Sequence, residues 1–328
     1  MGIAILNGIL TSLAERHGPK PLQTPSSSTS GTSTPAEELP QALPGRFIAC
    51  VRSAESAKRV KAALWEHSSV VTVVQRDNVA AARQADVVLL ACKPYMADAV
   101  LAEPGMADAL RGKLLVSVCA GVTADQMERA LHGEPSSSLS SSSSSSRPDP
   151  AEDGRCRVVR AMCNTAALIR ESMTVIGLTD PPLPPQLKTL VTWIFRRVGD
   201  VVYLPASTMD ASTALVGSAP AMFALMLEAA IDGAVAMGLP RAEAQRMATQ
   251  AMRGTTGLVQ AGEHPAILRE KVSTPGGCTI GGLLVLEEGR ARGTIARAIR
   301  EATCVASQLG KGVQGVNGTR FSTTPQQD

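Results

Sequence analysis

Short apolar runs alternate with helical patterns through the first half of the chain. Five of these runs lack the polar alternation of a half-exposed strand, which is typical of strands covered on both faces of a sheet. They are residues 47 to 51, 70 to 74, 87 to 91, 114 to 118 and 158 to 162. Ser53 can cap an intervening helix over residues 54 to 66, and Thr123 can cap another over residues 124 to 132. This succession predicts a doubly wound α/β fold with a parallel sheet of the nucleotide-binding type.

From about residue 183 the pattern becomes helical, and the last predicted helix covers residues 292 to 309. Residues 208 to 238 are almost continuously apolar, which a membrane-spanning helix would also be. Glu228 and Asp232 lie one turn apart inside this run, and each would cost roughly 2.5 to 3.5 kcal/mol at a bilayer centre. We therefore interpret the run as a helix buried in a subunit interface.

Two low-complexity stretches interrupt the sheet pattern, at residues 18 to 44 and 133 to 154. Segments rich in Ser, Pro, Thr and Gly bury too little apolar surface to offset their ordering entropy, so we expect surface loops. With these insertions, the predicted sheet domain covers residues 1 to 180. A helical domain over residues 181 to 310 and a flexible tail over residues 311 to 328 follow it.

Composition excludes several partners. The 328 residues carry a net charge of +3 from 32 basic and 29 acidic side chains, without a basic stripe that would follow a nucleic-acid backbone. Aromatic residues make up only 2% of the chain, which disfavours stacking on single strands. We expect neither nucleic acid nor a membrane as a partner.

The seven cysteines are odd in number, never spaced as CxxC and mostly flanked by apolar residues, so we interpret them as reduced, buried thiols. The four histidines lie far apart without metal-ligand spacing, and no metal site is predicted. No basic segment with a cleavage site marks the N-terminus, so the expected location is the cytoplasm.

The most informative stretch is residues 271 to 282. The hydroxyls of Thr274 and Thr279 flank Gly276 and Gly277 just before an apolar helix. Unblocked backbone amides and the helix dipole can hold a small carboxylate at such a place. An ordinary helix N-terminus with a Thr cap and a Gly-Pro turn has the same pattern, so the residues alone leave both interpretations open.

Residues 267 to 288, which contain this stretch, resemble the signature of pyrroline-5-carboxylate reductases, enzymes that make proline by NADPH-dependent reduction of a cyclic imine. Other segments resemble that family in the same order: 91 to 94 (Ala-Cys-Lys-Pro), 117 to 123 (Ser-Val-Cys-Ala-Gly-Val-Thr), 162 to 165 (Met-Cys-Asn-Thr), 217 to 221 (Gly-Ser-Ala-Pro-Ala) and 237 to 241 (Met-Gly-Leu-Pro-Arg). The Thr-Pro-Gly-Gly-Cys-Thr segment is specific, whereas the Lys-Pro and Asn-Thr pieces alone are weak. Outside the insertions, the resemblance extends to about residue 309.

The resemblance implies a Rossmann-like domain followed by an all-helical dimerisation domain that interlocks with a second subunit, in homo-oligomers built from such dimers. The implied reaction is NADPH-dependent reduction of 1-pyrroline-5-carboxylate to L-proline, at a site shared with a partner's helical domain. Two alternatives stay open: a reductase of a related cyclic imine in specialised metabolism, and a catalytically impaired subunit.

The resemblance also implies that Thr279 is the catalytic residue, with its hydroxyl hydrogen-bonded to the ring nitrogen. Hydride adds to a C=N carbon more readily when the nitrogen is protonated or hydrogen-bonded. The alternative role for Thr279 is a helix cap.

The implied substrate-binding residues surround this hydroxyl. The loop that starts at Thr274 and contains Gly276 and Gly277 holds the substrate carboxylate. Ser218 lies in the Gly-Ser-Ala-Pro-Ala segment, where Ala219 replaces a family glycine. Lys271 stands where some relatives carry Asn and can attract the carboxylate.

Arg52 and Ser53 end the first predicted strand, where a dinucleotide-binding fold recognises the adenosine ribose. Without Asp or Glu at this tip they suit a 2′-phosphate, because a hydrogen bond to a charged group contributes roughly 1.5 to 3 kcal/mol. NADPH is the expected cofactor, with NADH as a second candidate. Arg52 as a solvated surface residue is the alternative.

The resemblance adds further cofactor-binding residues: Gly2 at the start of the first helix, Asn78 near the adenosine ribose, and Cys92, Lys93, Pro94, Cys119 and Ala120 along the path to the nicotinamide. The family's first strand and the first two glycines of its Gly-x-Gly-x-x-Gly motif are not found before Gly2. That strand is central in the order 3-2-1-4-5, so we expect two neighbouring strands to lack a partner. An incomplete gene model and a relative with weakened cofactor binding both fit this departure.

Overall fold

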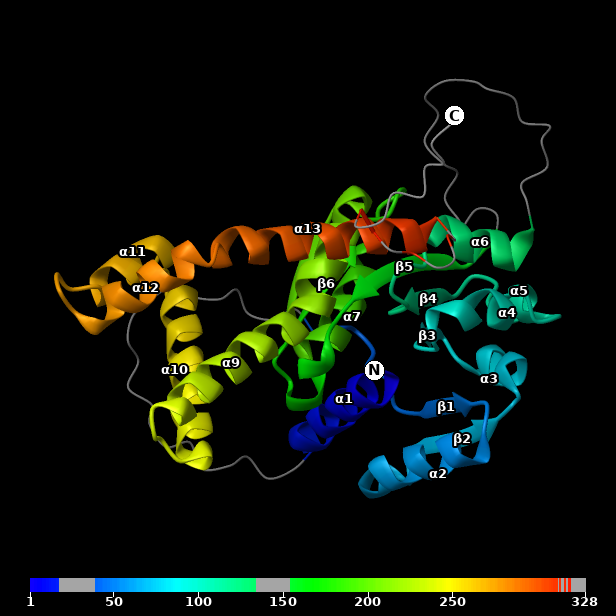
Figure 1. The fold of residues 1–328 in the computed structure, drawn as a ribbon. Helices are drawn as coiled ribbons and strands as arrows, with labels where there is room; N and C mark the ends of the chain where they lie inside the picture. The colour runs from blue at the N-terminus through cyan, green and yellow to red at the C-terminus, as the bar shows by residue number, and fades with distance from the viewer. Residues whose placement is uncertain (18–38, 134–153, 312, 314–315, 317, 320–328) are drawn as a thin grey trace, which may run out of the picture. The chain divides into compact units, whose positions relative to one another are not determined.

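The computed structural model describes residues 1–17, 39–133, 154–311, 313, 316, 318 and 319. The chain divides into two compact units (Figure 1). Unit 1 comprises Met1–Gly217 and Ala306–Val316, and unit 2 comprises Ser218–Val305 and Asn317–Asp328. Most of the predicted insertions and tail, including residues 18–38 and 134–153, lie outside the described residues.

The described residues of unit 1 form two sheets. β1 (Phe47–Val51) and β2 (Val71–Gln75) form a parallel pair. The larger sheet has the order β3-β4-β5-β6-β7, with β3 (Val87–Leu90), β4 (Leu114–Ser117), β5 (Arg157–Met162), β6 (Ser172–Gly177) and β7 (Gly199–Leu204). The five strands predicted from the sequence are β1 to β5, within a residue or two at each end.

The predicted strands pair in parallel, and the larger sheet adds an antiparallel strand, β6, that was not predicted. β6 runs antiparallel to β5, whereas β3, β4 and β5 are parallel and β7 is parallel to β6. The connection from residue 163 to residue 171 is shorter than the dozen or so residues that a parallel crossover needs. The chain therefore returns beside β5 in the opposite direction.

The helices of unit 1 mostly connect its strands. They are α1 (Gly2–His17), α2 (Ala54–Ala63), α3 (Asn78–Gln84), α4 (Ala97–Leu101), α5 (Met106–Ala109), α6 (Ala124–His132), α7 (Pro185–Arg196) and α8 (Met209–Ser212). Short 3₁₀ turns cover Trp65–His67, Pro94–Met96, Thr165–Ile169 and Ala206–Thr208, and a π-helical segment covers Thr213–Ser218. Both predicted caps are confirmed. Ser53 Oγ accepts the Ser56 amide at 3.1 Å, and Thr123 Oγ1 accepts the Gln126 amide at 3.2 Å.

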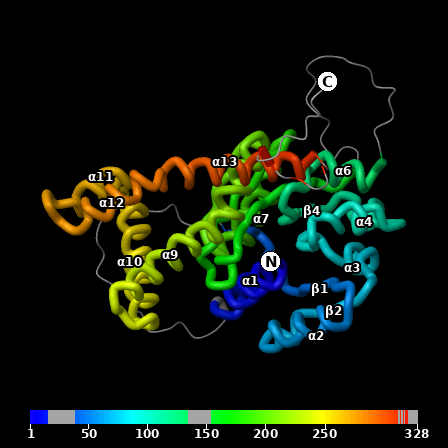
Figure 2. Tube along the Cα trace, viewed as in Figure 1, coloured from blue at the N-terminus to red at the C-terminus, as the bar shows by residue number. Residues whose placement is uncertain are grey.

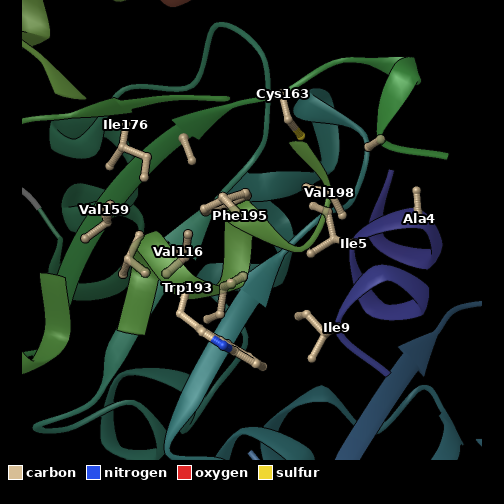
Figure 3. Close-up of a cluster of buried hydrophobic side chains, with 14 of the residues drawn as sticks. Ala4, Ile5, Ile9, Val116, Val159, Cys163, Ile176, Trp193, Phe195 and Val198 are labelled. Carbon is tan, nitrogen blue, oxygen red and sulfur yellow. The ribbon is translucent and has the colours of Figure 1, made fainter. Parts of the chain in front are cut away.

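Helix α1 packs against both sheets (Figures 1 and 2). Ile5 and Ile9 belong to the main core together with Phe195 of α7 and the inner strands (Figure 3). Leu10 joins a separate cluster with Val60 and with apolar side chains of β1 and β2. Between the two sheets, no strand of the described residues pairs with both β1 and β3, as expected from the sequence. Apolar packing on α1 therefore joins them.

The division between the units lies later than the predicted boundary at residues 180 and 181. β7 pairs with β6 along its whole length, from Ser172↔Gly199 to Gly177↔Leu204. The preceding helix α7 buries Trp193 and Phe195 in the main core. The helical pattern after residue 183 therefore begins inside unit 1, which continues to Gly217.

Unit 2 is helical, with α9 (Ala219–Ala236), α10 (Arg241–Gln260), α11 (Pro265–Val272), α12 (Cys278–Glu288) and most of α13 (Ala291–Gly310). Large apolar side chains are exposed on every one of these helices: Leu225, Met247, Val272, Val285 and Ile295. The helical run Ala206–Ala236 is long and apolar enough to cross a membrane, and only 22% of its most apolar window is buried. Much of the apolar surface of these helices therefore remains uncovered in a single chain.

Replacing Ile5 by Ala tests the role of α1. Ile5 is fully buried, so we expect the free energy of unfolding to fall by about 2 to 5 kcal/mol. The matched control is Asn7→Ala on the exposed face of the same helix, which should change it by less than about 0.5 kcal/mol. Urea unfolding followed by tryptophan fluorescence measures both, and equal losses would show that α1 is not a core element.

Candidate active site

Two arginines gather where β1 and β2 end. The carbonyl oxygen of Arg52 accepts a hydrogen bond from Nε of Arg76 at 3.1 Å and from Nε2 of Gln75 at 3.4 Å. Both arginine side chains are exposed. Ser53 uses its hydroxyl to cap α2, whose first amides lack helical partners. Two guanidinium groups and a helix N-terminus therefore flank the end of β1, a combination suited to an anion.

Arg76 was not predicted as a site residue from the sequence. Its position directly after a strand that pairs in parallel with β1 was the available signal, because neighbouring parallel strands end at the same edge. Arg76 has a φ of 55°, which is uncommon for a residue other than glycine. This conformation accompanies the hydrogen bond from its guanidinium to the carbonyl of Arg52.

Asn78 is held by a different neighbour. It begins α3, and its Nδ2 donates a hydrogen bond to Oε2 of Glu103 at 3.2 Å. Asp77 caps the same helix through the amide of Ala80. The structure thus places Asn78 just beyond β2 but engages its side chain with an acidic residue, a partner that the sequence analysis did not anticipate.

A second group of predicted cofactor residues lies at the ends of β3 and β4. A Cβ added to Gly2 would lie 3.0 Å from Cβ of Ala91, so α1 begins directly against the end of β3. Cys92 Sγ lies 3.9 Å from Cys119 Sγ, so the turns after β3 and β4 are in contact through these two side chains. Lys93 and Pro94 are exposed beside Cys92, and Ala120 follows Cys119.

The two thiols affect each other. The hydrogen bond between the sulfurs raises the pKa of Cys92 and lowers that of Cys119, because a single proton shared between them stabilises one thiolate. The pKa values of the buried thiols Cys156 and Cys163 have no such partner effect among their causes, and burial raises the pKa of each to about 11. The Cys92 and Cys119 pair is therefore chemically distinct from the core cysteines.

The predicted substrate loop lies in unit 2, between α11 and α12. Gly276 has a φ of 69°, and the amide of Gly277 donates a hydrogen bond to the carbonyl oxygen of Thr274 at 3.0 Å. A Cβ added at Gly277 would lie 2.5 Å from Thr274 Oγ1, so a side chain does not fit there. Gly277 is the N-cap of α12, and Thr279 is the second residue of that helix. The cap interpretation of Thr279 is therefore wrong.

The remaining predicted substrate residues are less closely associated with this loop. Lys271 Nζ forms an ion pair with Oε1 of Glu263 at 2.6 Å, which offsets its charge. Ser218 ends the π-helical segment Thr213–Ser218 and precedes α9. The structure thus places the Gly-Gly loop directly before α12 and Ser218 on a different element.

The fold, together with the family models that the chain matches, defines a Rossmann-like, NADP-dependent oxidoreductase with a helical dimerisation domain. Residues 206–309 match the family model described as pyrroline-5-carboxylate reductase dimerisation, and residues 34–121 match NADP oxidoreductase, coenzyme F420-dependent. The chain belongs to the pyrroline-5-carboxylate reductase family.

Individual relatives agree with this assignment. The chain is 61% identical to a pyrroline-5-carboxylate reductase of Lophium arboricola, over 98% of this chain and 94% of that protein. It is 53% identical to one of Neurospora crassa, over 98% of this chain and 93% of that protein. A pyrroline-5-carboxylate reductase structure from Coxiella burnetii shares the fold, with a TM-score of 0.68 at 24% identity, covering 93% of this chain and 95% of that one.

Because Gly276 has a left-handed backbone, its variants should differ in their free energy of unfolding. Gly276→Ala should lower the free energy of unfolding by about 1 to 2 kcal/mol, because a Cβ disfavours this conformation. Gly276→Asn should lose less, since Asn tolerates the left-handed region better. Chemical denaturation of the three proteins measures the order, and an alanine variant as stable as the original would contradict the loop geometry.

Proposed function

We propose that the protein reduces 1-pyrroline-5-carboxylate to L-proline with NADPH. The observation that carries this proposal is the loop from Thr274 to Thr279, in which Gly276 has a left-handed backbone, Gly277 stands against Thr274, and the Thr279 hydroxyl belongs to the first turn of α12. The names of the two fungal relatives support the same reaction.

The substrate carboxylate is assigned to the start of α12. The amide of Gly277 is already used inside the loop, so the unpaired amides are those of the first helical turn, at Cys278 and Thr279. These amides and the positive end of the helix favour an anion. Because Glu263 offsets the charge of Lys271, we give that lysine a supporting role in attracting the carboxylate.

Thr279 is proposed to donate its hydroxyl hydrogen bond to the ring nitrogen. Reduction places an electron pair on this nitrogen, and a positioned donor stabilises the developing charge until a proton arrives. Ser218 is retained as a substrate-binding residue on the family pattern alone.

We assign the cofactor to two groups of residues in unit 1, one at the ends of β1 and β2 and the other at the ends of β3 and β4. Arg52, Arg76 and the start of α2 would hold the 2′-phosphate, since guanidinium groups and unpaired helix amides favour an anion. The start of α1 at Gly2 would hold the pyrophosphate, as helix N-termini do. When bound, NADPH supplies the hydride that the imine carbon accepts.

The other proposed cofactor contacts lie around these groups. They are Ser53 and Asn78 near the adenosine ribose, and Cys92, Lys93, Pro94, Cys119 and Ala120 toward the nicotinamide. We infer a preference for NADPH over NADH from the two guanidinium groups.

A second copy of the chain is proposed to cover the apolar helices of unit 2, in homo-oligomers built from dimers. The exposed apolar side chains of α9 to α13 support an interface, as does the family match to a dimerisation domain. Asp232, inside the apolar run, pairs with Arg241 at 2.8 Å, which suits a wet interface better than a bilayer. Seven free cysteines support a reducing compartment such as the cytoplasm.

The direct test is NADPH oxidation by the purified chain with 1-pyrroline-5-carboxylate, against a control without substrate. Substrate-dependent oxidation with formation of proline is expected. A folded oligomer without turnover would contradict the proposal, and faster turnover of substituted pyrrolines would favour a related imine as the natural substrate.

Thr279→Val removes the proposed donor while keeping the shape of the side chain. We expect kcat to fall by about 10² to 10³, the usual effect of deleting one such donor, with NADPH affinity unchanged. Thr279→Ser retains a hydroxyl and should keep most of the activity. Steady-state kinetics decides, and a fully active valine variant would remove Thr279 from the mechanism.

Arg52→Ala and Arg76→Ala should each weaken NADPH binding by roughly ten-fold or more, because each loses a charged hydrogen bond of about 1.5 to 3 kcal/mol. NADH binding should stay close to that of the original protein. Arg111→Ala, near the opposite end of β4, is the control. Calorimetric titration measures the affinities, and equal losses for both cofactors would overturn the 2′-phosphate assignment.

A further inference from the structure

Two thiols stand side by side at the ends of neighbouring parallel strands. The β3 and β4 ladder ends at the pair Leu90↔Ser117, and Cys92 and Cys119 each follow two residues later. Paired strands lie about 4.8 Å apart, within the range of Cα separations that a disulfide spans. The two sulfurs are already 3.9 Å apart, so small side-chain rotations bring them to bonding distance.

The two cysteines differ in accessibility. Cys92 is partly exposed, whereas Cys119 is 2% exposed and its sulfur lies 3.5 Å from the carbonyl oxygen of Cys92. A small oxidant can therefore reach the first sulfur, and the second is held in contact behind it. Two sulfurs in contact, one of them partly open to solvent, can be joined reversibly as a disulfide.

We propose that Cys92 and Cys119 form a reversible dithiol–disulfide centre that responds to hydroperoxides. The one thiolate of the pair attacks the peroxide O–O bond, its sulfur becomes a sulfenic acid, and water or an alcohol is released. The other sulfur of the pair then displaces the sulfenic oxygen, which leaves as water, and the S–S bond forms. Two thiols and one hydroperoxide give one disulfide, so two electrons pass to the peroxide. A dithiol reductant reverses the reaction.

The position of this pair gives the oxidation a consequence, which rests on the proposed function. The thiols lie beside Gly2 and the end of β3, where the nicotinamide end of the cofactor is assigned. The turn after Cys119 has little room to adapt, since a Cβ on Gly121 would lie 3.2 Å from Leu309. In addition, Gln126 donates a hydrogen bond to the Gly310 carbonyl at 2.8 Å. Drawing the two turns together should therefore change the cofactor surface and weaken NADPH binding.

The test uses the full chain treated with hydrogen peroxide, followed by alkylation of free thiols and peptide mass spectrometry. A cross-link between the Cys92 and Cys119 peptides, removed by dithiothreitol, is the expected result. Stable sulfenic acid or alkylation at Cys92 with Cys119 still free would overturn the proposal. Because this readout needs no cofactor, it remains decisive even if the proposed function fails.

The second readout is the NADPH dissociation constant of the reduced and the oxidised protein. Oxidation should raise it at least several-fold, and dithiothreitol should restore it. In Cys92→Ala, peroxide should no longer change the constant, whereas Cys156→Ala, a buried thiol outside the pair, should respond like the original protein. A mapped disulfide with an unchanged constant would overturn the link between this centre and the cofactor.

Discussion

The packing of α1 between two separate sheets is the constraint on which unit 1 depends. Among the described strands, none is hydrogen-bonded to both β1 and β3, so apolar contacts take the place of a ladder. Ile5 and Ile9 enter the core of the larger sheet, and Leu10 enters the cluster over β1 and β2. Each buried aliphatic side chain contributes about 1.5 to 3 kcal/mol, so three or four of them can fix the helix. Glu15 adds an ion pair with Arg170 at 3.1 Å.

This packing also determines where the candidate chemistry lies. With α1 fixed, Gly2 stands against Ala91 and the first helical amides lie at the end of β3. The arginines after β1 and β2 depend on a separate set of hydrogen bonds around the Arg52 carbonyl. In unit 2 the helices expose large apolar side chains. The contacts around Gly276 and Gly277 are local, since Gly277 stands against Thr274 of the same loop. The loop can therefore keep its shape whatever covers the helices.

The sequence pattern predicted those elements that depend on neighbouring residues. The strands β1 to β5 are continuous apolar runs, and the caps at Ser53 and Thr123 need only neighbouring amides. Strand β6 escaped prediction because Ser172 and Thr174 are fully or almost fully buried polar residues within it. The later end of unit 1 depends on β7 pairing with β6, which no local pattern encodes.

Among the site residues, too, those in one short segment were predicted from the sequence, whereas pairings between segments were not. The glycines of the substrate loop were identified from the sequence because they form a contiguous segment with Thr274 and Thr279, and the left-handed backbone at Gly276 agrees with glycine there. The ion pair of Lys271 with Glu263, the hydrogen bond of Asn78 with Glu103 and the contact of Arg76 with Arg52 join residues from different elements or turns. Such pairings depend on the tertiary fold, which the residue types alone did not reveal.

The central claim is that the two groups of unit 1 residues form one cofactor-binding surface. Amide hydrogen exchange with and without NADPH tests it most directly, because it reports each segment separately and requires no turnover. The account predicts slower exchange at the start of α1, in the turn after β1 and in the turns after β3 and β4. Protection confined to one group, or none at saturating NADPH, would contradict it.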